Sequence, residues 1–140
     1  LNYIYRNQLS ESLAIPECGE LDCLLVNTTG ELRYFYQEAT VVFVGKSLTA
    51  KGGQNPIEPA ALAKPIIFGP HMENFGDITA RFLSNEAAVQ VANEAELYEA
   101  IDLLLTDEKK RNDMGRAALK VVQENEGAAE KSVSMILAAI

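Results

Sequence analysis

The chain has 140 residues, 48% of them hydrophobic and 23% charged, a composition typical of one soluble globular domain with a core of its own. Its 20 Asp and Glu outnumber its 12 Lys and Arg, so the net charge is −8. That balance argues against a domain held to nucleic acid by bulk charge, which requires a basic face, but it allows one nucleotide in a local pocket. Cys18 and Cys23 lack the spacing of zinc ligands, and we expect no metal site.

Five apolar runs of strand length follow one another along the chain. They are "YIYR" at residues 3–6, "CLLVN" at 23–27, "TVVFVG" at 40–45, "PIIFG" at 65–69 and "AAVQVA" at 87–92. Runs that are continuous in hydrophobicity, rather than alternating, are typical of parallel strands covered on both faces. We therefore predict a parallel sheet with helices on both sides.

Helices are predicted between these runs, and their start signals share one spacing. Pairs of residues three apart, as in a capping box, are Thr28 with Glu31, Asn74 with Asp77, and Asn93 with Glu96. Later, "DEKKRNDMGRAALKVVQEN" predicts a helix that Gly127 ends, and "AAEKSVSMILAAI" predicts a last one. Strands that alternate with helices through short joins predict right-handed βαβ units, and thus an α/β fold with a Rossmann-like, three-layer parallel sheet.

In such sheets ligands bind beyond the carboxyl ends of the strands, where loops meet the starts of helices. The loop at residues 46–58 follows a predicted strand and has this place in the fold. Gly52 and Gly53 have no Cβ, so the backbone there can approach a ligand closely. Lys46 and Lys51 would add positive charge beside it.

The helix that follows the glycine pair has two predicted starts. Asn55 could cap it with Pro56 in the first position, or it could begin at Glu58 with Pro59 first. With either start, free N–H groups favour an anion, phosphate above all. Glu58 would lie beside that phosphate, where a carboxylate can accept hydrogen bonds from both hydroxyls of a ribose. On the pattern alone, a ribose contact and a mere capping box are equally good interpretations of Glu58.

Two further loops end strands of the predicted sheet. Gly30, Glu31 and Leu32 open a helix, where N–H groups could meet the edge of a base and Leu32 could pack on its face. A capping role for Glu31 with Thr28 is the favoured alternative. His71, the one histidine of the chain, could donate to a hydroxyl or carboxylate of a sugar, although a lone loop histidine more often has a structural role.

Three motifs, in this order, resemble one family: "GEL" at residues 30–32, "GGQNPIEPAA" at 52–61 and "GPHMENF" at 69–75. From about residue 23 to residue 122 the chain is similar to the C-terminal half of the 3-deoxy-D-manno-octulosonic acid (Kdo) transferases. The resemblance implies the C-terminal domain of a two-domain GT-B glycosyltransferase. It also implies metal-independent transfer of Kdo from CMP-Kdo to a lipid A precursor in lipopolysaccharide assembly, with inversion at the anomeric carbon.

The resemblance assigns CMP binding to two segments of this chain. By position in the motifs, the CMP-binding residues are Gly30, Glu31 and Leu32 in the first segment and Asn55, Pro56, Ile57 and Glu58 in the second. Candidate contacts to phosphate or sugar are Gly52, Gly53, Lys51 and His71. Many family members have His at the position of Gln54 and Gly at that of Lys46, differences that affect side-chain contacts to the sugar and not the backbone site.

The chain begins with Leu1 rather than Met, and we expect a piece of a longer protein. In that interpretation residues 1–140 form one C-terminal domain that binds the donor nucleotide. The family's N-terminal domain, with the general base and the acceptor site, and a first strand of this domain with a Pro-Arg pair would precede Leu1. The piece alone would be inactive, with no catalytic residue of its own, and the parent enzyme would work on the cytoplasmic face of the bacterial inner membrane.

Two other functions remain open at this point. Another GT-B enzyme that uses a UDP-sugar, such as an N-acetylglucosaminyl transferase or epimerase, would share an acidic residue at a helix start. A non-catalytic interaction module would bind no nucleotide. Binding of CMP compared with UDP separates the three interpretations, since fold alone does not define function.

Overall fold

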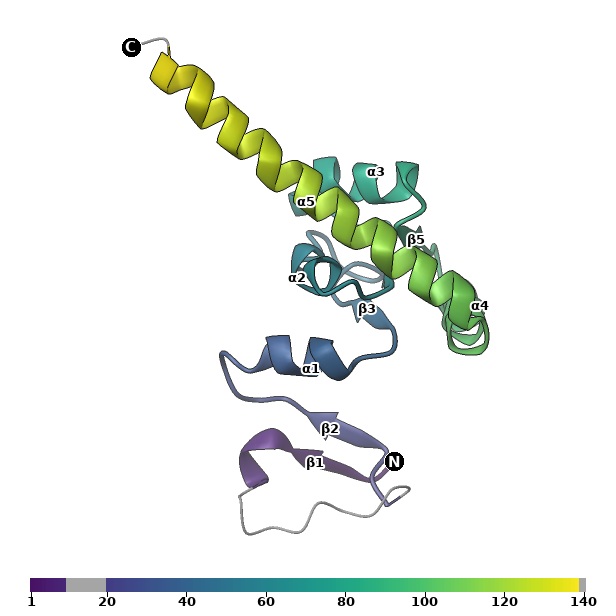
Figure 1. Ribbon diagram of the computed structural model, residues 1–140. Helices are drawn as coiled ribbons and strands as arrows, with labels where there is room; N and C mark the ends of the chain where they lie inside the picture. The colour runs from purple at the N-terminus through teal and green to yellow at the C-terminus, as the bar shows by residue number, and fades with distance from the viewer. Residues whose placement is uncertain (10–19, 139–140) are drawn as a thin grey trace. The chain divides into compact units, whose positions relative to one another are not determined.

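The computed structural model describes residues 1–9 and 20–138, with side chains up to residue 125 (Figure 1). The chain forms two compact units, Leu1–Phe35 and Tyr36–Ile140. Each unit is built around parallel strands, as the sequence predicts.

The first unit contains a two-stranded parallel sheet. Strand β1 (Tyr3–Tyr5) pairs with β2 (Cys23–Leu25), and Ile4 lies opposite Leu24. A 3-10 turn, η1 (Arg6–Gln8), follows β1, and helix α1 (Leu32–Glu38) begins seven residues after β2 ends. The thiol of Cys23 is free and half-buried, whereas Cys18 lies outside the described residues.

The second unit contains a three-stranded parallel sheet in the order β3-β4-β5. Its strands are β3 (Val42–Val44), β4 (Ile66–Phe68) and β5 (Ala88–Gln90). Its helices are α2 (Ile57–Ala61), η2 (Glu73–Phe75), α3 (Gly76–Ser84), α4 (Glu94–Thr106) and α5 (Glu108–Ala138).

Helices cover both faces of this sheet. Ile66 and Phe68 pack on one face against side chains of α2, α3 and the middle of α5. Ile67 points to the opposite face and packs against α4 and the first part of α5. All three β4 side chains are fully buried, which explains why that strand reads as an unbroken apolar run. The three layers predicted from the sequence are therefore present in this unit.

Most of the predicted elements are confirmed. Each of the five apolar runs contains a strand, shorter than the run by one to three residues. The predicted cap at the start of α4 is present, because the Asn93 side chain accepts a hydrogen bond from the N–H of Glu96 at 3.0 Å. The Glu96 carboxylate in turn accepts from the N–H of Ala92 at 2.7 Å.

Three local predictions are wrong. Helix α1 begins at Leu32, within the segment predicted to open it, but the predicted cap is wrong, because the hydroxyl of Thr28 donates to the carboxylate of Glu31. Asn74 lies inside η2, and α3 begins at Gly76 without a side-chain cap. Helix α5 continues past Gly127, since one glycine in a helix costs only about 1 kcal/mol relative to alanine.

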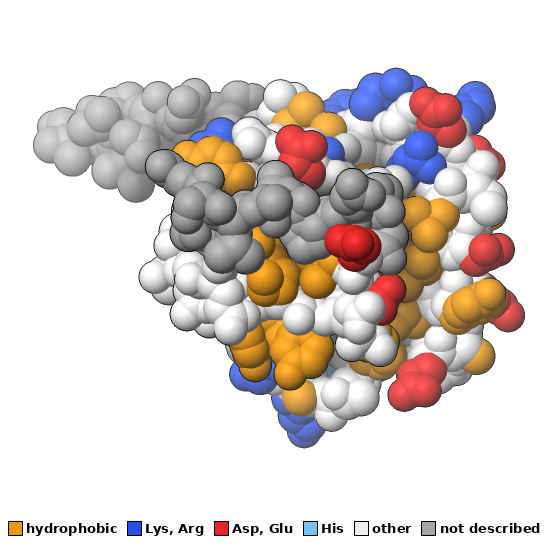
Figure 2. Space-filling model, turned by 90° about the horizontal axis from the view of Figure 1, so that it is seen from below, with side chains coloured by type: hydrophobic (Ala, Val, Ile, Leu, Met, Phe, Trp, Pro, Cys, Tyr) orange, Lys and Arg blue, Asp and Glu red, His pale blue; other side chains and the backbone are white. Residues whose placement is uncertain are grey.

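Exposed hydrophobic side chains occur in both units, and Figure 2 shows some of them scattered over one face of the molecule. The larger ones include Tyr3 and Tyr34 in the first unit and Tyr98 and Leu105 in the second. Scattered apolar residues of this kind are normal for a protein surface. Within the described residues, no helix has both the length and the apolar character needed to cross a membrane.

Candidate functional site

The loop at residues 46–58 leaves the carboxyl end of β3 and is tied to the loop that leaves β4. The fully buried Ser47 makes this connection: its Oγ accepts the N–H of Gly69 at 2.8 Å and donates to the carbonyl oxygen of Val44 at 2.5 Å. The carbonyl oxygen of Ser47 also accepts the N–H of His71 at 2.9 Å. Ser47 thereby satisfies the carbonyl oxygen of Val44 and the N–H groups of Gly69 and His71 without water.

The glycine pair in this loop forms hydrogen bonds within the protein. The N–H of Gly52 donates to Oε2 of Glu73 at 2.7 Å, and the N–H of Gly53 donates to the carbonyl oxygen of Lys46 at 3.2 Å. The predicted contacts of these glycines with phosphate or sugar stay predictions, and through their N–H groups they would require an exchange of these two bonds.

Both glycines are also required by the backbone and by close packing. Gly52 has φ +104° and Gly53 has φ +62°, the left-handed region that favours glycine. A Cβ on Gly52 would come within 2.9 Å of Nδ2 of Asn74, and one on Gly53 would collide with Sδ of Met72. The glycine pair therefore lies directly against the "GPHMENF" loop.

Helix α2 begins at Ile57, between the two predicted starts. Oδ1 of Asn55 accepts the N–H of Ile57 at 3.0 Å, and Nδ2 of Asn55 donates to Oε1 of Glu58 at 3.2 Å. Pro56, which is buried, lies between these groups. Asn55 thus satisfies the helix start and also holds one oxygen of the Glu58 carboxylate.

Donors and an acceptor remain free at this helix start. Among the described residues, none accepts a hydrogen bond from the N–H of Gln54, Asn55 or Glu58. In the same part of the chain, Oε2 of Glu58 accepts none, and the Glu58 side chain is exposed. Because α2 has only five residues, these individual N–H groups matter more for an anion than the small dipole of the helix.

Tyr36 is a neighbour of this site that the sequence did not reveal. Burial raises the pKa of its hydroxyl above the ordinary value, and the negative charge of Glu58 raises the pKa further. Tyr36 belongs to the run "YFY" at residues 34–36. Nothing in that local pattern indicates that Glu58, more than 20 residues later, lies near Tyr36.

The first segment predicted to bind CMP lies in the other unit. Gly30 has φ +83°, and Glu31 is held by two donors: the hydroxyl of Thr28 and, at 2.8 Å, Nη2 of Arg6. The hydrogen bond from Thr28, followed by the charge of Arg6, holds the pKa of the Glu31 carboxyl below its ordinary value against the opposing effect of burial. Leu32 is 46% exposed. The N–H groups and the apolar side chain, rather than the engaged carboxylate, are the groups this segment offers.

The remaining predicted contacts lie in the second unit. Nδ1 of His71 is 3.4 Å from Oε1 of Glu73, and the ring is partly exposed. Lys51 is exposed and forms no ion pair with a described residue. The structure therefore gathers the residues that flank "GGQNPIEP" in one unit and places Gly30, Glu31 and Leu32 in the other.

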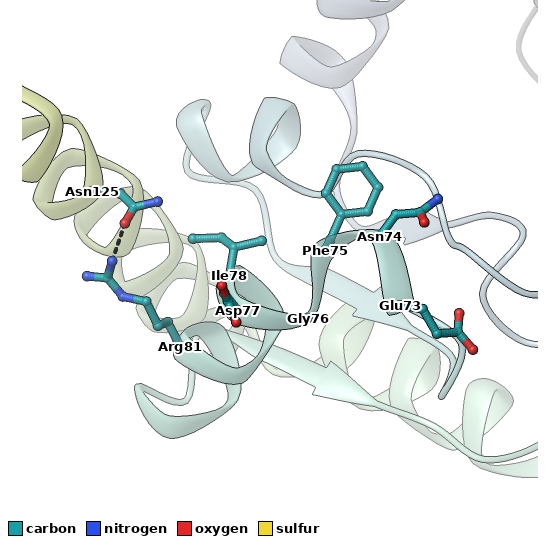
Figure 3. Close-up of a pocket in the computed structure, with 8 residues that line it drawn as sticks. All are labelled: Glu73, Asn74, Phe75, Gly76, Asp77, Ile78, Arg81 and Asn125. Atoms are coloured by element: carbon teal, nitrogen blue, oxygen red, sulfur yellow. Dashed lines mark hydrogen bonds between the residues drawn. The ribbon is translucent and has the colours of Figure 1, made fainter.

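A hollow of about 560 Å³ lies beside the "GPHMENF" loop (Figure 3). It is lined by Glu73, Asn74, Phe75, Gly76, Asp77, Ile78, Arg81 and Asn125. Arg81 closes one end by donating to the side chain of Asn125, while the Glu73 carboxylate points away from that end. The lining includes no residue of α2 or of the loop before it, although Glu73 and Asn74 also contact Gly52 of that loop.

Comparison with known proteins places the chain in a family. Residues 22–121 match the family described as "Glycosyl transferases group 1", and the chain belongs to that family. Within it, the chain is 33% identical over 114 residues to the 3-deoxy-D-manno-octulosonic acid transferase of Haemophilus influenzae, covering 81% of this chain and 27% of that protein. The corresponding enzyme of Rickettsia prowazekii is 36% identical over 107 residues, 75% of this chain and 23% of that protein.

A solved structure is similar as well. The C-terminal CMP-Kdo binding domain of WaaA from Acinetobacter baumannii has a TM-score of 0.77 and 26% identity, covering 88% of this chain and 62% of that one. The chain spans about a quarter of the length of the curated relatives it matches. The predicted resemblance to Kdo transferases and the predicted fold class, the C-terminal domain of a GT-B glycosyltransferase, are both confirmed.

Proposed function

We propose that this chain is the donor-binding part of an enzyme that transfers Kdo from CMP-Kdo to a lipid A precursor. The observation that carries the proposal is the similarity, over 88% of the chain, to a domain named for CMP-Kdo binding. The free donors and free carboxylate oxygen at the start of α2 support it independently, because N–H groups suit a phosphate and a carboxylate oxygen suits the hydroxyls of a ribose.

Each group at the start of α2 has a proposed role. Oε2 of Glu58 accepts hydrogen bonds from the ribose hydroxyls, while Asn55 keeps the carboxylate in place through Oε1. The free N–H groups of Gln54 and Asn55 donate to the phosphate. Lys51 lies in the loop at residues 46–58, and His71 lies in the "GPHMENF" loop. Both would meet the phosphate or the carboxylate of the sugar acid.

The proposed role of the first unit is to bind the base. The N–H groups of Gly30 and Glu31 would meet polar atoms at the base edge, and the exposed Leu32 would cover its face. The carboxylate of Glu31 already accepts bonds from Thr28 and Arg6, so it contributes by fixing the turn.

In the proposed reaction an acceptor hydroxyl attacks the anomeric carbon of Kdo with inversion. The bond from that carbon to the phosphate oxygen of CMP breaks, and the hydroxyl proton passes to a carboxylate base on an N-terminal acceptor domain. This chain would stabilise the charge on the departing phosphate with N–H groups and Lys51, so we propose that no metal is required. In this proposal residues 1–140 act as one donor domain, which alone is inactive, of an enzyme at the cytoplasmic face of the inner membrane.

The proposal is tested by titrating the 140-residue chain with CMP and with UDP while following amide resonances near Gly30 and Asn55. CMP should bind at least tenfold more tightly than UDP. Glu58→Ala and Glu58→Gln should each weaken CMP while the fold is kept, because alanine removes the acceptor and glutamine replaces a charged acceptor with a neutral one, which forms weaker hydrogen bonds. Glu99→Ala, which removes an exposed carboxylate on α4, is the matched control and should leave CMP affinity unchanged.

The outcomes separate the competing functions. A preference for UDP would assign the chain to an enzyme that uses a UDP-sugar. No response to either nucleotide would favour an interaction module instead. Unchanged CMP affinity in both Glu58 variants would remove the ribose contact from the proposal.

A further inference from the structure

The two ends of the candidate nucleotide site are held by different means. At the ribose end, Asn55 and Glu58 belong to the start of α2, which is fixed because Pro56, Pro59 and Ala60 are buried. At the phosphate end, residues 48–54 form no helix or strand, and their residues 49–51 are exposed. Leu48 packs against the core and Gly52 and Gly53 are buried, but the exposed residues between them need another source of order, because an irregular exposed segment keeps much of its conformational entropy.

One side chain outside the loop supplies it. Oε2 of Glu73 accepts the N–H of Gly52 at 2.7 Å, and this is the hydrogen bond that joins residues 48–54 to a described residue beyond the loop. The bond has an ionised acceptor and is therefore among the stronger kinds. The next residue, Asn74, leaves no room for a side chain on Gly52, so contact and hydrogen bond fix the same peptide.

We propose that Glu73 is a positioning residue for the phosphate end of the nucleotide site, holding Gly52 so that the free N–H groups of Gln54 and Asn55 keep their place. The inference rests on the proposed function, because it assumes that a nucleotide phosphate binds at these N–H groups. Glu73 itself touches no part of the nucleotide in this proposal. It acts through the backbone of the two residues between Gly52 and Asn55.

Both oxygens of the Glu73 carboxylate have a nitrogen neighbour, Oε2 the N–H of Gly52 and Oε1 the ring of His71. The N–H of Glu73 itself, then that of Gly52, and more weakly His71, keep the pKa of the Glu73 carboxyl below its ordinary value, so the acceptor stays ionised near neutral pH. A direct electrostatic effect of Glu73 on a phosphate would be unfavourable, since two negative charges repel. Repulsion alone predicts that a substitution that keeps the charge leaves CMP affinity unchanged, whereas positioning predicts that loss of reach at the same charge weakens it.

Two substitutions of Glu73 separate the length of its side chain from its charge. Glu73→Asp keeps the charge but is one methylene too short to reach the N–H of Gly52. Glu73→Gln removes the charge but keeps an acceptor oxygen at the same reach. Positioning predicts that Glu73→Asp weakens CMP about fivefold, as expected for loss of one charge-assisted hydrogen bond at an exposed site, and that Glu73→Gln binds CMP as well as the parent chain or better.

The measurement is a chemical-shift titration of the 140-residue chain with CMP and with cytidine, which lacks the phosphate. Glu73→Asp should lower CMP affinity about fivefold and change cytidine affinity less than twofold, because only the phosphate end is loosened. Thermal unfolding shows whether each variant is folded, and Glu99→Ala again controls for net charge. Both Glu73 substitutions are conservative and lie on a half-exposed side chain, so the fold should be retained.

The results distinguish this inference from the proposed function. If the parent chain binds no CMP, the proposed function fails. If it binds CMP, the inference alone is overturned when Glu73→Asp matches the parent chain, when Glu73→Gln is as weak as Glu73→Asp, or when CMP and cytidine are weakened equally.

Discussion

Asn55 has two structural roles that one pair of substitutions can separate. Its Oδ1 accepts the N–H of Ile57 at 3.0 Å, and its Nδ2 donates to Oε1 of Glu58 at 3.2 Å. Asn55→Ala removes both interactions. Asn55→Asp keeps an oxygen for the helix start but places a second carboxylate beside Glu58.

The two substitutions should therefore differ in stability. Asn55→Ala leaves the N–H of Ile57 without its acceptor, which costs about 1 kcal/mol, the usual loss when such a cap is removed. For a chain of this length that corresponds to a fall in Tm of about 4 °C. Asn55→Asp should stay within about 0.5 kcal/mol of the parent chain, since aspartate caps as well as asparagine does.

CMP affinity should follow a different order. Both variants lose the donor that holds Glu58, so both should bind CMP less tightly than the parent chain. Asn55→Asp should have the lower CMP affinity of the two, because its charge repels Glu58 and the phosphate. We expect about fivefold for Asn55→Ala and more than tenfold for Asn55→Asp. Urea unfolding and CMP titration on the same samples provide the two measurements. An aspartate variant that binds CMP like the parent chain would refute the assigned role of the amide donor.

Two further predictions concern the frame of the site and its response to pH. Ser47→Ala should lower the free energy of unfolding by about 2 kcal/mol, measured by urea denaturation, because the N–H of Gly69 would be buried without an acceptor; a loss below 0.5 kcal/mol would contradict this. The folded-state pKa values of Glu31 and Glu73 lie below the ordinary 4.5, so their contribution to stability is present above that value and is lost as pH falls through the lower folded pKa. Unfolding measured between pH 6 and pH 3 should therefore show a smaller acid loss in Glu73→Gln than in the parent chain, and an identical profile would contradict the depressed pKa of Glu73.

The parts of the fold that could be predicted are those specified by neighbouring residues. The run "PIIFG" predicts β4 because a strand covered on both faces must be apolar at every position, and Ile66, Ile67 and Phe68 are all fully buried. Asn93 and Glu96 predict the start of α4 because both hydrogen bonds of the cap form within four residues.

The parts that could not be predicted depend on residues far apart in the sequence. The spacing of Thr28 and Glu31 resembles a capping box, but Glu31 binds Arg6, 25 residues earlier, and the helix starts later. Gly52 and Glu73 are 21 residues apart, and no local pattern links a glycine N–H to that carboxylate. The sequence therefore predicts that the backbone at the glycine pair can approach a ligand closely, but it does not reveal that the N–H groups of both glycines already have acceptors.

The candidate site lies between these cases. Asn55 and Glu58 were predicted from spacing and from the family motif, and the structure shows them hydrogen-bonded to each other at the start of α2. Tyr36 and Glu73 were not predicted as part of the site, because each interacts with a residue more than 20 positions away in the sequence, Tyr36 with Glu58 and Glu73 with Gly52.

A crystal structure of the 140-residue chain with CMP tests the central claim most directly. We predict that one or both ribose hydroxyls lie about 2.5–3.0 Å from the Glu58 carboxylate, with the phosphate accepting from the N–H of Gln54 or Asn55. CMP bound at another place on the sheet, or with its ribose hydroxyls beyond about 3.6 Å from Glu58, would contradict the account.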